Sequence, residues 1–107
     1  MNTIVLKNTS PDSIATDVMF NIASERACGA EILKLFISAE IDAAKRDKMF
    51  SAVQKLLRGM KKQGRIQFFA CLDDFTEATT EAQFLKNKYP EQEFFSSEEI
   101  HFIIVRI

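Results

Sequence analysis

Apolar and polar positions follow each other along the chain in blocks that predict four strands and three helices. Apolar runs at 3–7, 31–38, 66–72 and 100–107 are typical of short strands, and the run 31–38 reads as a strand covered on both faces. Between these runs, residues 10–28, 43–63 and 76–89 repeat apolar side chains at helical spacing. This β-α-β-α-β-α-β order predicts an α/β fold with crossover connections and a largely parallel sheet, with helices on its faces.

Local signals predict where the helices begin and end. Ser10 before Pro11 predicts an N-cap followed by proline in the first helical position. Gly29 and Gly64 predict the ends of the first and second helices, and Pro90 stops the third. The inward positions are expected at Ile14, Val18 and Ile22, at Met49, Val53, Leu56, Leu57 and Met60, and at Ala78, Ala82 and Leu85. A brief extended piece is expected at 93–95.

Length and composition indicate one domain that spans residues 1–107. The chain is 47% hydrophobic and 27% charged, which is typical of a globular protein. The first residues show no charged segment followed by an apolar one, so we expect no signal peptide, and no run reaches the ~20 apolar residues of a membrane span. Cys28 and Cys71 have no CxxC spacing, so we expect two buried free thiols and a cytoplasmic location.

The net charge of −1 conceals a strong asymmetry. Residues 45–65 hold eight basic residues and one acid, a formal charge of +7, whereas residues 73–99 are rich in acids. A basic amphipathic helix can neutralise phosphates, which predicts contact with DNA or RNA. The candidate binding residues are Lys45, Arg46, Lys48, Lys55, Arg58, Lys62 and Arg65. The alternative is a solvated face that the acidic third helix balances.

Catalytic chemistry has little support in the sequence. It contains no GxGxxG, Walker A, HExxH or GxSxG motif, and we expect neither a metal nor a cofactor. Its one histidine, His101, lies between apolar neighbours, where a backbone-bonded strand position is expected rather than a general base. Asp73 and Asp74 follow the third strand, where they suit a turn or helix cap better than a Mg²⁺ site.

Four runs of the sequence resemble, in order, the Smr (small MutS-related) domain family, and its short stand-alone bacterial members above all. They are DVMFNIASERACGAEILKLFIS (17–38), MFSAVQKLLRGMKKQGRIQFF (49–69), FLKNKYP (84–90) and IIVRI at the carboxyl terminus. The resemblance implies a two-layer or three-layer βαβαβ(α)β sandwich with a four-stranded mixed sheet. It also implies binding to DNA or RNA, with endonuclease activity in many members.

The family's two motifs are absent from this chain. Leu-Asp-x-His at the end of the first strand falls on Val5, Leu6 and Lys7, and His-Gly-x-Gly after the second falls on 37–40. Ala39 and Glu40 carry Cβ atoms where glycines would let the backbone approach a phosphate. The resemblance therefore implies a degenerate, non-catalytic member.

Three hypotheses follow. The first is a degenerate Smr-like domain that binds nucleic acid through its basic helix. The second is a protein-interaction or self-association domain, including a homodimer paired through an edge strand. The third is a metal-dependent hydrolase that uses Asp73, Asp74, Glu40 and Asp42, provided that these acids converge in space.

Overall fold

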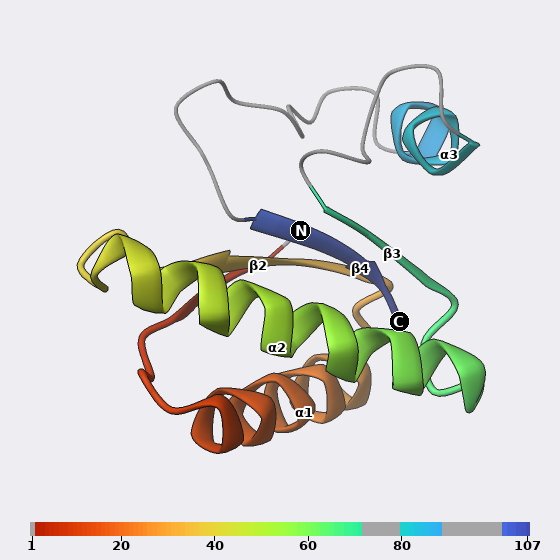
Figure 1. Cartoon of the computed structure of the whole chain (residues 1–107). Helices are drawn as coiled ribbons and strands as arrows, with labels where there is room; N and C mark the ends of the chain where they lie inside the picture. Colours follow the sequence, from red (N-terminus) through yellow and green to blue (C-terminus); the bar gives the residue numbers. More distant parts are fainter. Residues whose placement is uncertain (1, 72–79, 89–101) are drawn as a thin grey trace.

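The computed structural model describes residues 2–71, 80–88 and 102–107, which form a four-stranded sheet and three helices (Figure 1). In chain order the elements are β1 (Asn2–Leu6), α1 (Pro11–Ala27), β2 (Ile32–Ile37), α2 (Ala43–Lys62), β3 (Phe68–Cys71), α3 (Thr80–Lys88) and β4 (Phe102–Arg106). The predicted α/β class and element order are confirmed. None of the described helices is long and apolar enough to cross a membrane.

The sheet is mixed, with strand order β1-β2-β4-β3. β1 and β2 are parallel, whereas β4 lies antiparallel to both β2 and β3. The mixed sheet implied by the family resemblance is therefore correct, and the largely parallel sheet expected from strand–helix alternation is wrong. Alternation gives the order of elements but does not fix the direction in which the last strand returns.

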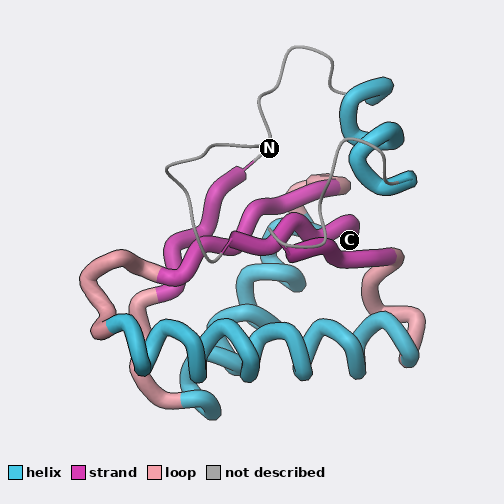
Figure 2. Tube along the Cα trace, turned by 45° about the horizontal axis from the view of Figure 1, so that its top comes forward, coloured by secondary structure: helices cyan, strands magenta, loops and turns pink. Residues whose placement is uncertain are grey.

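One face of the sheet packs on α1 and α2, which lie side by side beneath it (Figures 1 and 2). The strands contribute alternate residues to this core, as their period of two requires. Leu33, Leu35 and Ile37 of β2 face the two helices together with Ile103 and Val105 of β4. The helices contribute Ile14, Val18 and Ile22 from α1 and Met49, Val53, Leu57 and Met60 from α2, which the apolar spacing predicts correctly.

The opposite face of the sheet is also buried at its centre. Phe102 and Ile104 have no exposed surface, and Lys34 is 6% exposed. The Lys34 Nζ atom lies 4.6 Å from the centroid of the Phe102 ring. Burial removes water from the ammonium group and lowers the pKa of Lys34 below its ordinary value of 10.5.

α3 lies on this second side of the sheet, near β3 (Figure 1). The Arg106 guanidinium lies 3.9 Å from the centroid of the Phe84 ring, and Phe84 meets Phe68 edge-on at 6.2 Å. Lys88 at the end of α3 forms an ion pair with Glu31. A cation–aromatic cluster and one exposed ion pair thus hold α3 against the sheet.

Several local expectations are confirmed, and some differ. Ser10 is the N-cap of α1 with Pro11 following it, although its side chain makes no capping hydrogen bond. Cys71 is buried and accepts a hydrogen bond from Gln54 Nε2 at 2.9 Å, but Cys28 is exposed because it follows the last turn of α1. β3 begins at Phe68, later than the predicted start at Ile66, although the Gln67 N–H still donates a hydrogen bond to the Arg106 carbonyl of β4.

The remaining expectations fall outside the described residues. They concern Asp73, Asp74, His101, the extended piece at 93–95, and the start and end of the predicted third helix.

Glycines at 59 and 64 should respond oppositely to alanine substitution. Gly59 is helical whereas Gly64 has φ +71°, and an added Cβ would meet no described atom within 4 Å at either position. Gly59→Ala is expected to raise the free energy of unfolding by about 0.5–1 kcal/mol, because glycine is a poor helix former. Gly64→Ala is expected to lower it by about 1 kcal/mol, because alanine resists a left-handed conformation. Urea titrations measure both free energies of unfolding. Changes of the same sign would contradict the helical conformation of Gly59 or the left-handed conformation of Gly64.

Lys34 should make stability depend on pH. Its folded-state pKa lies below its unfolded value, so the folded protein binds this proton less tightly than the unfolded chain does. The charged ammonium group of Lys34 therefore lowers the free energy of unfolding at pH values below its folded-state pKa. This loss of stability disappears as the pH rises toward about 10.5 and the group gives up its proton. The stability of the wild type relative to Lys34→Met is expected to increase between about pH 7 and pH 10. A constant difference in urea titrations across this interval would contradict it.

Candidate nucleic-acid interface

The exposed face of α2 carries four cations in one row, here called the basic stripe: Lys48, Lys55, Arg58 and Lys62. All four side chains are exposed. Their spacings of three, four and seven residues keep them on one side of a helix. The buried positions of α2 fix its opposite side against the sheet, so packing of the core aims the basic stripe at solvent.

The cations of the stripe are not neutralised by acids among the residues that the structure describes. None of the four forms an ion pair with any residue in the described ranges 2–71, 80–88 and 102–107. α3 lies on the other side of the sheet (Figures 1 and 2), so it does not cover the stripe. The stripe is consequently an open surface of positive charge, which is the property that phosphate binding requires.

The other three predicted binding residues occupy different surroundings. Lys45 is exposed in the first turn of α2, and Arg65 is exposed in the turn that follows α2, where its carbonyl accepts a hydrogen bond from Arg26. Arg46 precedes Lys48 by two residues, so it points away from the stripe. It is half-buried, and its Nε is fully buried without a hydrogen-bond partner among the described residues. Lys61, which is exposed beside the stripe, is absent from the predicted set.

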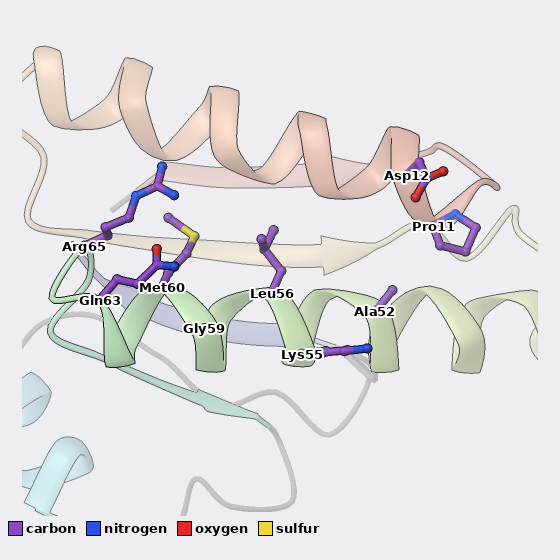
Figure 3. Close-up of a pocket in the computed structure, with 9 residues that line it drawn as sticks. All are labelled: Pro11, Asp12, Ala52, Lys55, Leu56, Gly59, Met60, Gln63 and Arg65. Carbon is purple, nitrogen blue, oxygen red and sulfur yellow. The ribbon is translucent and has the colours of Figure 1, made fainter.

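A groove of about 480 Å³ runs between α1 and α2, next to the basic stripe (Figure 3). Its apolar part is formed by Ala52, Leu56, Gly59 and Met60 of α2, and its polar lining comes from Lys55, Gln63 and Arg65. Pro11 and Asp12 of α1 close one end, and Arg65 and Gln63 lie at the other (Figure 3). Lys55 belongs both to the stripe and to the groove, so the two features form one surface.

The turn between β2 and α2 uses two of its backbone N–H groups in hydrogen bonds within the turn. Ser38 is buried, its Oγ accepts a hydrogen bond from the Glu40 N–H at 3.2 Å, and its carbonyl accepts one from the Ile41 N–H at 3.2 Å. Ile41 is buried as well, which holds the turn against the core. The two N–H groups are thus engaged within the turn and do not form a cradle for a phosphate.

The acids that the hydrolase hypothesis requires are only partly placed. Glu40 and Asp42 are exposed in the turn before α2, whereas Asp73 and Asp74 lie outside the described residues. Within the described part of the chain, no three His, Cys, Asp or Glu side chains come together as metal ligands would. The structure therefore gives this hypothesis no assembled site among the residues it places.

The sequence reasoning missed the groove because two helices and a turn build it. Pro11 and Asp12 are some forty residues away from Ala52 and Leu56 along the chain, and only the packing of α1 beside α2 brings them together. One signal in the sequence does point to it. Gly59 interrupts an otherwise strong helix pattern near its end, where no turn is required.

Comparison with known proteins supports the fold. No protein-family model matches the chain, and no curated protein matches it. Among solved structures, the chain is similar to the Smr domain of Thermus thermophilus MutS2, with 17% sequence identity and a TM-score of 0.60. The alignment covers 99% of this chain and 96% of that one. At this identity the likeness shows a shared fold, so this chain has the α/β fold with a four-stranded mixed sheet seen in that Smr domain.

Proposed function

We propose that this protein is a degenerate Smr-like domain that binds nucleic acid without cleaving it. The observation that carries the proposal is the basic stripe, which is exposed along α2 and free of ion pairs with the described residues. A row of cations on one rigid helix can follow a phosphate backbone, and each neutralised phosphate releases a counterion. The Smr-like fold and the resemblance to a family that binds DNA or RNA support the same assignment.

The non-catalytic part of the proposal is supported by the turn after β2. Ser38 engages the N–H groups of Glu40 and Ile41, and the side chain of Glu40 places a negative charge where phosphate would approach a glycine-rich loop. Lys7 stands after β1 at the position of the family's first histidine. Neither turn carries the histidine that the family's motif has at that position.

Removing the stripe should weaken binding and flatten its dependence on salt. A variant with Lys48→Gln, Arg58→Gln and Lys62→Gln is expected to lose affinity for nucleic acid by about tenfold or more at about 50 mM salt. The slope of log affinity against log salt should fall by about 2 to 3, since each duplex phosphate contact contributes about 0.9. Fluorescence anisotropy with labelled RNA and DNA at several salt concentrations measures both quantities.

A control variant removes one lysine from the other side of the sheet, against the three cations removed from the stripe. Lys86→Gln on α3 changes the net charge without touching the stripe, so its affinity and salt slope should stay at the wild-type values. Equal effects of the stripe variant and the control, or wild-type binding that is indifferent to salt, would overturn the proposal.

Self-association is a second candidate, favoured by two apolar side chains at the surface. Phe20 on α1 is 71% exposed, and Val5 on β1 is 46% exposed. β1 pairs only with β2 among the described strands, so it forms one edge of the sheet. An edge strand with exposed apolar side chains can pair with a second copy of the chain.

Sedimentation velocity at several protein concentrations tests this candidate. If the chain dimerises through the edge strand β1, Val5→Glu should shift the population toward the monomer, because a charge in the interface is desolvated without a partner. A wild type that sediments as a monomer at every concentration, or a Val5→Glu variant that dimerises equally well, rules it out.

A further inference from the structure

We propose that the groove between α1 and α2 receives an unstacked base, so that this protein prefers single-stranded nucleic acid over duplex. The inference rests on the proposed function and specifies its ligand. The basic stripe alone would hold any phosphate backbone, since cations on a helix carry no information about the bases. The groove adds an apolar recess beside that stripe.

The groove has the size and the lining of a ligand site. Its volume of about 480 Å³ lies within the range of small-molecule pockets, and between Ala52 and Gln63 it follows α2 for about 16 Å. Ala52 and Leu56, which are both half-buried, supply apolar surface on which the flat face of a base can rest. A paired base inside a duplex shows only its edges, so this contact is open to unstacked bases alone.

The polar groups around the groove suit a base whose phosphates lie on the stripe. Lys55 stands at the boundary between groove and stripe, where a phosphate of the nucleotide with the inserted base would lie. A base at one end of the groove would meet Gln63, which can donate and accept hydrogen bonds, and Arg65, which donates. A base at the other end would meet Asp12, which accepts, as from an exocyclic amine. The carboxylate of Asp12 repels phosphate, which favours the phosphates along α2 and the base in the groove.

Gly59 is the independent sign that this space is a feature of α2 rather than a packing defect. Glycine is unfavourable in a helix relative to alanine, so its presence normally reflects a close neighbour or a special dihedral angle. Neither applies here, because its φ is not positive and an added Cβ would meet no described atom within 4 Å. Because Gly59 has no side chain, it leaves the groove open between Lys55 and Gln63.

Filling the groove from Gly59 tests the inference without disturbing the fold. Gly59→Leu places a side chain in the groove, and leucine favours the helix more than glycine does. The probes are a labelled single strand of about 12 nucleotides, as RNA and as DNA, and the duplex of the same sequence. The wild type is expected to bind the single strand about tenfold more tightly than the duplex, and Gly59→Leu to lose that advantage while keeping its duplex affinity.

A control variant separates groove filling from the mere addition of a leucine. Ser24→Leu adds the same side chain to the exposed face of α1, outside the groove, and should retain the single-strand preference. Circular dichroism confirms that each variant is folded before its binding is measured.

The outcomes of this experiment and of the stripe experiment are distinguishable. Equal, salt-dependent binding of single strand and duplex by the wild type overturns the groove inference and leaves the proposed function standing. A Gly59→Leu variant that keeps the single-strand preference, or that loses duplex and single-strand affinity equally, also overturns it. If no probe binds at low salt, both the inference and the proposed function are wrong.

Discussion

The structure depends on the insertion of β4 between β2 and β3. This strand comes last among the described elements, and four of its five residues, Phe102 to Val105, are completely or almost completely buried. It hydrogen-bonds to a neighbour on each side and contributes apolar side chains to both faces of the sheet. Without it, β2 and β3 would have no common partner, and the core above α1 and α2 would lose its centre. The last strand in the sequence must therefore pair with both β2 and β3 before the sheet is complete.

α2 has a buried apolar face and an exposed basic face, and the packing of the apolar face determines where the basic face points. Met49, Val53 and Leu57 fix the rotation of the helix about its axis by packing into the core. Once this rotation is fixed, the basic stripe must face solvent, and the small residues Ala52 and Gly59 must face the gap beside α1. The charge pattern and the groove are thus consequences of the same hydrophobic contact.

The site proposed here lies on the helical face of the domain, away from the carboxyl ends of the strands where α/β proteins usually bind ligands. At that usual location, Ser38 has closed the turn after β2 through its hydroxyl and its carbonyl, and Ile41 anchors the turn in the core. A turn whose N–H groups are satisfied internally is stable but offers nothing to a phosphate. The shared fold with the Smr domain of MutS2 therefore does not imply a shared site.

The sequence alone determined the order of the elements, the inward residues of α1 and α2, and the basic face of α2, because these follow from local periodicity and from short-range signals such as Pro11 and Gly29. It did not determine the antiparallel return of β4, the exposure of Cys28 or the burial of the Arg46 Nε atom. Nor did it show the groove, whose walls come from positions far apart in the chain. Periodicity describes which side of an element is apolar, whereas strand direction and the space between two helices depend on contacts between distant segments, and only the tertiary structure decides these.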